Sequence, residues 1–346
     1  MTQPLSSLLV VDFTTLLPGP LATLILARAG AKIIKIERPE GDEMRQFGPF
    51  VDGKSLPFEL LNRGKTCQTV DLKNPAETAK VLNLLASADI VVEQFRPGVM
   101  ARLGLDYATL SALNPRLIYC SITGYGANGP LAHKAGHDLN YIAESGLLDL
   151  SRGGSEAPVL PPALIADIAG GSLPGVINIL LALLQRDKTG RGVHLDIAMS
   201  QSTFALMPFA LADVLSGQSS PPSGTGMLTG GLARYNLYST RDGRMLAIAA
   251  LEDRFWRNVC AITGLEEEFH DDHATPAASH KRLRAIIASE DSDVWMARFA
   301  QSDCCVSLVH SVDEAISNPQ FSALFGDKSI LPLPISRHFS AGGDHG

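Results

Sequence analysis

The sequence predicts an α/β protein: a large domain built on a Rossmann-like, doubly wound parallel sheet, and a smaller α+β domain after it. Two observations predict the sheet. Short strand-like runs alternate with helical patterns, which is the chain order of such folds. Residues 8–13 and 89–95 are apolar runs, as strands are when helices cover both faces of a parallel sheet. The predicted strands are residues 8–13, 31–37, 69–72, 89–95, 117–122 and 194–199.

The first strand, a helix predicted over residues 21–29 and the second strand form a βαβ unit. The helix follows Pro18 and ends at Gly30, both ordinary boundary residues. The turn at 14–19 lacks the closely spaced glycines that a dinucleotide pyrophosphate needs. We therefore expect a Rossmann-like sheet without a Rossmann cofactor.

A third observation predicts the second domain. Residues 217–231 are rich in Ser, Gly and Pro, and the pattern changes after them. Residues 235–251 are typical of a hairpin with Gly243 in its turn, and helices follow. The expected division is 1–190 with 326–346 as the large domain, 191–231 as a connecting helix and loop, and 232–325 as the small domain. The connecting helix is predicted over 201–215.

Composition narrows the class of protein. The 346 residues carry a net charge of -7, which argues against nonspecific nucleic-acid binding because that needs a basic surface. The five cysteines have no CxxC spacing and fit free thiols in a reducing compartment. The start of the chain lacks signal-peptide features, and the apolar runs are too short or interrupted for a membrane span. We expect a cytoplasmic protein with no membrane partner.

Two residues 30 positions apart carry the candidate chemistry. His137 lies between Gly136 and Asp138; it could satisfy a local hydrogen bond, or it could be a base beside a ligand that Gly136 lets approach. Asp167 precedes a long apolar helix, so it could simply be an N-cap. A cap does not need the Gly170-Gly171 pair, however, and bare amides at a helix start can stabilise an oxyanion.

The patterns around the other charged residues and histidines are weaker evidence for a functional role. Arg38, Arg63, Lys65 and Arg96 could be surface charges or could bind phosphate on one rim of the sheet. Glu252 follows the hairpin and is typical of a solvated turn. His133 and His137 lack a third ligand at diagnostic spacing, so no metal site is expected, and no GxSxG elbow supports serine hydrolysis.

Short motifs, all different from one another, are spread along nearly the whole chain. In order, they are Asp12-Phe13, Pro18-Gly19-Pro20, Lys35 to Pro39, Leu61 to Lys65, Val92 to Gly98, Ile122 to Gly126, Gly136 to Tyr141, Asp167 with Gly170-Gly171-Ser172, Gly190 to Gly192, Asp242-Gly243, Glu252 with Phe255-Trp256, and Asp303 to Val306. This ordered set resembles the class III CoA-transferase superfamily, and within it the α-methylacyl-CoA racemases.

The resemblance implies an interlocked homodimer in which one chain's large domain meets the partner's small domain at the site. It implies an acyl-CoA substrate and no separate cofactor. It places CoA along the rim of Arg38, Arg63, Lys65 and Arg96. Five further residues are expected to bind the CoA thioester beside that rim: Gly124, Tyr125, Gly136, Asp138 and Tyr141.

The resemblance also separates two reactions. In the racemases, the equivalents of His137 and Asp167 are the two acid/bases, and the equivalent of Glu252, from the other subunit, orients the histidine. In the transferases, the equivalent of Asp167 is the nucleophile, and the histidine is typically missing. The resemblance therefore implies racemisation of 2-methylacyl-CoA thioesters. The alternatives are CoA transfer between carboxylic acids and a non-catalytic CoA-binding protein.

One stretch departs from the family pattern. Residues 335–346 do not show the closing helix that many members have after their last loop. We expect this departure to affect the return of the chain to the large domain rather than the site.

Overall fold

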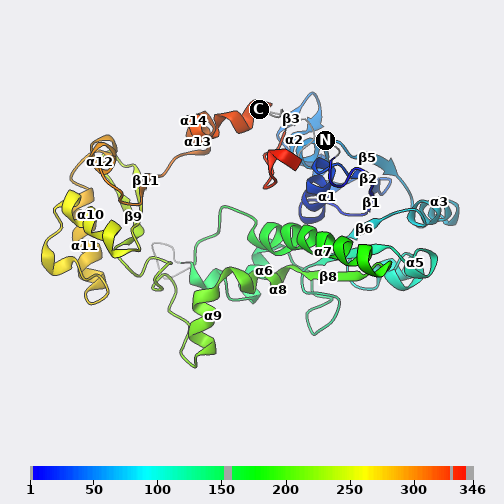
Figure 1. Cartoon of the computed structure of the whole chain (residues 1–346), viewed down its shortest axis with the longest axis horizontal. Helices are drawn as coiled ribbons and strands as arrows, with labels where there is room; N and C mark the ends of the chain where they lie inside the picture. Colours follow the sequence, from blue (N-terminus) through cyan, green and yellow to red (C-terminus); the bar gives the residue numbers. More distant parts are fainter. Residues whose placement is uncertain (1–2, 152–157, 328–329, 340–346) are drawn as a thin grey trace. The chain divides into compact units, whose positions relative to one another are not determined.

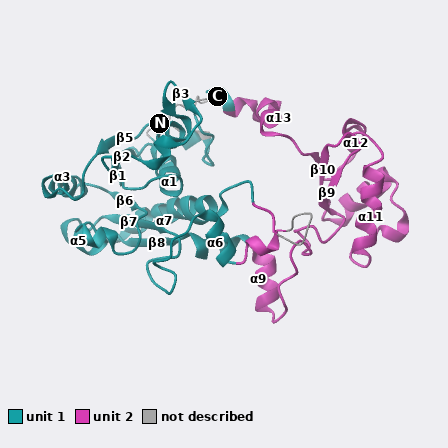
Figure 2. Cartoon of the chain, turned by 180° about the vertical axis from the view of Figure 1, so that it is seen from behind, with its two compact units in different colours: residues 1–145, 161–206, 325–346 teal, residues 146–160, 207–324 magenta. Residues whose placement is uncertain are grey.

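The computed structural model describes residues 3–151, 158–327 and 330–339. The chain divides into two compact units, which Figure 2 colours separately. Unit 1 consists of residues 1–145, 161–206 and 325–346, and unit 2 consists of residues 146–160 and 207–324.

Unit 1 is built on a six-stranded sheet in which every neighbouring pair of strands is parallel (Figure 1). The strand order is β5-β2-β1-β6-β7-β8. The strands are β1 (Leu9–Asp12), β2 (Lys32–Glu37), β5 (Thr66–Thr69), β6 (Ile90–Glu93), β7 (Ile118–Thr123) and β8 (His194–Ala198). This is the doubly wound order, with its topological switch between β1 and β6. The predicted parallel sheet is confirmed.

Both faces of this sheet are buried because successive side chains of a strand point to opposite sides. Val11 and Ile34 belong to one apolar cluster with residues of helices α3 (Pro75–Leu85) and α5 (Tyr107–Leu113). Val10 and Ile33, their neighbours in the chain, are equally buried, and helices α1 and α7 contact β1 and β7. The helices of unit 1 are α1 (Pro18–Arg28), α2 (Leu56–Asn62), α3 (Pro75–Leu85), α4 (Val99–Arg102), α5 (Tyr107–Leu113), α6 (Asp138–Glu144), α7 (Leu173–Thr189) and α8 (Met199–Ser202).

Unit 2 contains a three-stranded antiparallel sheet in the order β11-β10-β9. The predicted hairpin is formed by β9 (Tyr235–Ser239) and β10 (Met245–Ala249), with Gly243 at φ 77° between them. Its own core gathers Trp256, Trp295 and neighbouring apolar side chains. The remaining elements are β11 (Val306–Leu308), α9 (Pro208–Leu215), α10 (Asp253–Thr263), α11 (Pro276–Ile287), α12 (Ser292–Phe299), α13 (Val312–Ser317) and α14 (Pro319–Ser322).

The strand predicted over 194–199 is confirmed as β8. Because it pairs with β7 as an edge strand, it belongs to the sheet of unit 1 and not to a segment connecting two domains, as residues 191–231 were expected to be. The helix expected over 201–215 is broken between α8 and α9, because Pro208 has no backbone N–H and begins a new helix instead of continuing one. Residues 328–329 and 340–346 of the expected C-terminal return lie outside the described residues. Within 330–339, the structure has the short turn η7 (Arg337–Phe339).

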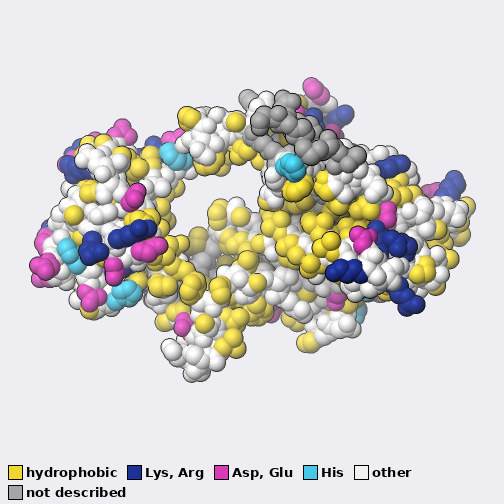
Figure 3. All heavy atoms as spheres, viewed as in Figure 1, with side chains coloured by type: hydrophobic (Ala, Val, Ile, Leu, Met, Phe, Trp, Pro, Cys, Tyr) yellow, Lys and Arg dark blue, Asp and Glu magenta, His cyan; other side chains and the backbone are white. Residues whose placement is uncertain are grey.

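One helical stretch, Ala166–Thr189, is long and apolar enough by length and composition to cross a membrane. The apolar runs were expected to be too short or too interrupted for a membrane span, but this helix meets the length and composition required, because the turn around Gly170 continues directly into α7. The stretch is partly buried, and α7 contacts β7, β8 and α1, as a core helix does. Its outer face still exposes Ile177, Leu181 and Leu184, and Figure 3 shows hydrophobic side chains gathered over this helix.

Candidate active site

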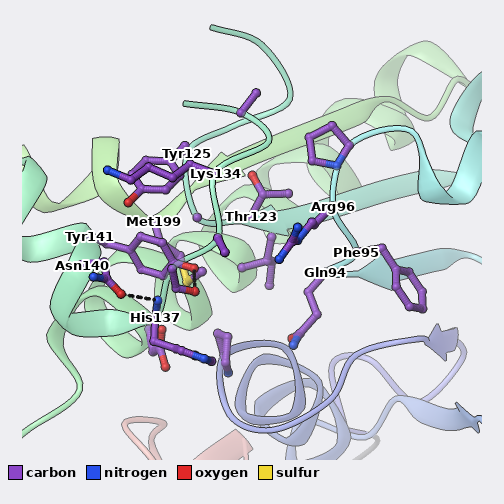
Figure 4. Close-up of a pocket in the computed structure, with 18 of the residues that line it drawn as sticks. Gln94, Phe95, Arg96, Thr123, Tyr125, Lys134, His137, Asn140, Tyr141 and Met199 are labelled. Carbon is purple, nitrogen blue, oxygen red and sulfur yellow. Dashed lines mark hydrogen bonds between the residues drawn. The ribbon is translucent and has the colours of Figure 1, made fainter. Parts of the chain in front are cut away.

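A cavity of about 430 Å³ opens in unit 1 at the carboxyl ends of β1, β6 and β7. It lies at the switch point between β1 and β6, where ligands bind in doubly wound sheets. Figure 4 shows that Arg96 and His137 extend into it from different sides. Its walls are Leu16, Pro18, Gln94, Phe95, Arg96, Pro97, Ile122, Thr123, Gly124, Tyr125, Ala132, Lys134, Ala135, Gly136, His137, Asn140, Tyr141, Asp167 and Met199.

The turn after β1 is held by buried charges. Leu16 has φ 60°, a left-handed conformation that is costly for a branched residue. Its N–H donates to Asp42 Oδ1 at 3.1 Å, and Asp42 in turn pairs with Lys35 at 2.9 Å. Lys35 Nζ also donates to the carbonyl of Thr14. These contacts fix a turn that local sequence would not favour, and they place Leu16 in the cavity wall.

Lys65 lies inside this framework rather than on the rim. Its side chain is fully buried, with Nζ 3.3 Å from Asp12 Oδ2 and 2.9 Å from both the Pro20 carbonyl and Asn62 Oδ1. Burial is the main cause that lowers the pKa of Lys65 to about 8, although Asp12 opposes that shift. The interpretation of Lys65 as a CoA-binding residue is wrong, because its ammonium group points into the protein and is already fully bonded.

Gln94 ties the loop after β6 to the turn after β1. Its side-chain amide donates to the Thr15 carbonyl at 2.7 Å and accepts the N–H of Gly19 at 3.2 Å. Arg96 follows on the same loop and lines the cavity. The two sides of the switch point are therefore joined by one side chain, and Arg96 is carried on a supported loop.

His137 is the N-cap residue of α6. It is exposed, and its backbone N–H donates to Asn140 Oδ1 at 3.0 Å. Gly136, which lines the cavity, also lets a side chain approach, because a Cβ there would lie 2.8 Å from the Tyr141 ring. A Cβ on Gly124 would lie 2.4 Å from the same ring. The two glycines therefore make room for Tyr141, whose hydroxyl donates to the Gly136 carbonyl.

Asp167 is part of a π-helical segment, η3 (Ala166–Ser172), which continues into α7. The N-cap residue is Ile165, so Asp167 is not the cap that its position suggested. The N–H of Asp167 donates to Asp138 Oδ1 at 2.9 Å, so this amide is not bare. The Gly170-Gly171 pair has a packing reason, because a Cβ on Gly170 would lie 2.6 Å from the Met199 carbonyl.

The electrostatics of Asp167 suit proton transfer. Partial burial is the largest cause that raises its pKa, and the nearby charge of Asp138 raises it further, to about 6. The charge of His137 lowers the pKa of Asp167, so the imidazole lies close enough to act on the carboxyl electrostatically. A carboxyl group with this pKa exchanges protons readily near neutral pH.

The structure brings most of the predicted site residues together. Those in the cavity wall are Arg96, Gly124, Tyr125, Gly136, His137, Tyr141 and Asp167. Asp138 is buried behind Asp167. Arg38 and Arg63 are not among the described residues that line the cavity; they pair with Glu43 at 2.6 Å and Asp327 at 3.4 Å. Glu252 belongs to unit 2, where it is the N-cap residue of α10.

Sequence reasoning missed several residues of the wall, among them Gln94, Lys134, Asn140 and Met199. Gln94 could have been found, since it lies at the carboxyl end of the strand predicted over 89–95. Met199 could not, because it reaches the cavity only through the pairing of β8 beside β7. In the part of the chain that the structure describes, no group of three or more His, Cys, Asp or Glu side chains could hold a metal ion.

Comparison with known proteins gives a consistent family. The sequence model described as CoA-transferase family III matches residues 5–325. The acetyl-CoA:oxalate CoA-transferase of Acetobacter aceti is 34% identical over 92% of this chain and 84% of its own length. The human α-methylacyl-CoA racemase is 32% identical over 90% of this chain and 79% of its own. The crystal structure of a CAIB/BAIF family protein from Brucella suis superposes with a TM-score of 0.84 at 32% identity, covering 97% of this chain and 93% of that one.

Proposed function

We propose, because the chain belongs to CoA-transferase family III, that it racemises 2-methylacyl-CoA thioesters by moving the α-proton through an enolate. The observation that carries this proposal is that His137 and Asp167 line the same cavity, where the charge of His137 acts on the pKa of Asp167. Two acid/base groups in one cavity are what inversion at a carbon requires, since one must remove a proton while the other supplies one.

The proposed reaction uses each residue in both directions. Neutral His137 takes the α-proton from one enantiomer, and protonated Asp167 returns a proton to the opposite face of the enolate. The roles are reversed for the other enantiomer. The raised pKa of Asp167, about 6, supports this scheme because both protonation states are populated near neutral pH. Stabilisation of the enolate oxygen must also lower the barrier, because the α-proton of a thioester is weakly acidic.

In this proposal CoA is part of the substrate, and neither a metal nor a redox cofactor takes part. Arg96 is the cation of the cavity wall that we expect to contact the CoA, and Arg38 and Arg63 would contact its phosphates farther out. Gly124, Tyr125, Gly136 and Tyr141 would form the wall beside the thioester, with Asp138 supporting Asp167. We further propose that the enzyme acts in the cytoplasm.

We also propose a homodimer in which Glu252 of one subunit orients His137 of the other. The apolar stripe of α7 supports an interface with another chain, since Ile177, Leu181 and Leu184 are 55%, 58% and 62% exposed. We expect the wild-type protein to sediment as a dimer and Leu181→Asp to shift it toward the monomer.

Subunit mixing tests the shared site. Mixed His137→Ala and Glu252→Ala proteins form heterodimers in which one of the two sites is intact, if Glu252 acts across the interface. Statistical exchange would then restore about a quarter of wild-type activity. If Glu252 acts within its own chain, every site in the mixture lacks one residue and no activity returns.

The second candidate is CoA transfer with the Asp167 carboxylate as the nucleophile. The position of Asp167 in the cavity and the resemblance to an acetyl-CoA:oxalate CoA-transferase both favour it. A third reading, a CoA-binding protein without catalysis, does not use the His137 and Asp167 pair.

One experiment separates the three. The protein is incubated with a single enantiomer of a 2-methylacyl-CoA in deuterated water, with and without an added carboxylic acid. Racemisation predicts α-deuterium incorporation and loss of optical purity without the acid. Transfer predicts acid-dependent CoA movement that Asp167→Ala abolishes and His137→Ala does not. A binding protein would do neither, and absence of exchange would refute the racemase.

A further inference from the structure

A buried carboxylate that the proposed reaction does not use lies at the base of the loop that carries Arg96. Glu93 is the last residue of β6 and is 5% exposed. Its Oε2 accepts the backbone N–H of Phe95 at 2.8 Å, and the Ser121 side chain on the neighbouring strand β7 also bonds to it. A buried carboxylate is costly unless its hydrogen bonds compensate. Glu93 therefore calls for a role.

The loop above Glu93 has little freedom apart from the peptide that Glu93 holds. Gln94 is tied to the turn after β1 through Thr15. Pro97 restricts the residue before it, Arg96, to extended conformations. The remaining variable is the peptide of Phe95, whose N–H is bonded to Glu93. Phe95 and Arg96 both line the cavity, so this one bond sets the direction of two wall residues.

Glu93 is itself held by a chain of contacts that leads to the edge strand. Ser121 Oγ lies 2.9 Å from His194 Nε2 on β8. The His194 ring stacks on Tyr107, with centroids 5.4 Å apart, and meets Tyr119 edge-on. Asp196, also on β8, accepts the N–H of Ala127, and its negative charge disfavours the ionised form of Glu93 instead of holding it. The support for Glu93 thus comes from two neighbouring strands of the rigid sheet.

We propose that Glu93 is a positioning residue for thioester binding, which fixes Phe95 and Arg96 toward the cavity by accepting the Phe95 N–H. The inference rests on the proposed contact of Arg96 with CoA. Burial is the main cause that raises the pKa of Glu93 to about 7, so the ionised form costs folding free energy. A group that acted only as structural support would be expected to stabilise the fold instead.

The test compares three variants in the binding of CoA, measured by calorimetry, and in the kinetics of α-exchange. Glu93→Met removes the acceptor at similar size, and Glu93→Gln keeps an oxygen acceptor. Asp89→Ala removes a carboxylate that accepts the Leu9 N–H at 2.9 Å just before the other end of β6. We expect Glu93→Met to raise KM and the Kd for CoA about tenfold with kcat within about threefold. Glu93→Gln should recover most of the affinity, and Asp89→Ala should lower the Tm without changing KM.

Equal effects of Glu93→Met and Asp89→Ala on KM would overturn the inference, as would a loss confined to Tm. Amide hydrogen exchange of residues 94–98 gives a readout that does not depend on activity. We expect faster exchange in Glu93→Met, and unchanged protection would refute the positioning role. If wild-type protein bound no CoA, the proposed function would fail, while the exchange measurement would still decide whether Glu93 holds the loop.

Discussion

The starts of two helices supply the two proposed bases, and they are built differently. His137 is the N-cap residue of α6, is exposed and is held through its backbone by Asn140. Asp167 lies within a π-helical turn, is half-buried and donates its N–H to Asp138. The imidazole is accessible, while burial and the negative charge of Asp138 raise the pKa of the Asp167 carboxyl to about 6. The proposed reaction uses this difference, since it needs a base and an acid in one cavity.

The largest loss of activity is expected when either of the two proposed bases is removed. We expect Asp167→Asn and His137→Gln each to lower racemisation about 10³-fold, within the usual contribution of a general acid/base. Each variant should still exchange the α-proton of one enantiomer, because its remaining base faces that proton. Mass spectrometry of each enantiomer in deuterated water measures this. Equal loss of exchange from both enantiomers in both variants would contradict the assignment of opposite faces.

The packing of the π-helical turn is tested by Gly170→Ala. The added Cβ would lie 2.6 Å from the Met199 carbonyl, a backbone atom that cannot rotate away. We expect a loss of about 1–3 kcal/mol in the free energy of unfolding, measured with denaturant. Gly175→Ala on α7 is the matched control, since its Cβ would come nearest to the movable end of the Ile122 side chain, at 3.2 Å, and would meet no backbone atom among its nearest contacts. A similar loss in both variants would show that helix packing in general, and not this turn, is sensitive.

The charge behind Asp167 is tested by Asp138→Asn, which keeps an oxygen to accept the Asp167 N–H. Removing the negative charge should lower the pKa of Asp167 from about 6, because that charge raises it. Where Asp167 acts as the base, it must be ionised, so kcat/KM rises with pH through this pKa. The rise should therefore move to lower pH, and activity at pH 5 should increase a few-fold in that direction. An unchanged pH profile would remove Asp138 as a cause.

The smallest effect is expected at the start of α6. Asn140→Ala removes the oxygen that accepts the N–H of His137. We expect a loss of about 0.5 kcal/mol in the free energy of unfolding, since this is one exposed hydrogen bond. Thermal unfolding measures it, and Leu139→Ala, at an exposed neighbour, is the control. A large loss of racemisation here would mean that the imidazole depends on this contact for its direction.

Much of the fold and both proposed bases could be predicted from the sequence, because they depend on local patterns. Apolar runs such as that of β6 identify parallel strands, and a histidine beside a glycine and an aspartate attracts attention without any structure. Lys65 was misinterpreted because its partner Asp12 is 53 positions away, and a lysine in a polar loop looks exposed. Gly124 was attributed to a ligand alone because the Tyr141 ring that needs the space lies 17 positions later in the chain. Contacts between distant segments were the part that patterns could not supply.

Because Asp167 lies in a π-helical segment, inserting or deleting a single residue there would change the direction of its side chain. A π turn contains about one residue more than an α turn, and each residue of an α-helix advances by about 100°. Deleting Ile168 would therefore rotate Asp167 by about 100° relative to α7 and turn its carboxyl out of the cavity, while α7 kept its packing on the sheet. Conversely, inserting one residue into a regular α-helix beside such a cavity would turn a side chain from another face of the helix into the cavity. A single insertion could therefore give a helix that packs only in the core a carboxyl group that faces a substrate.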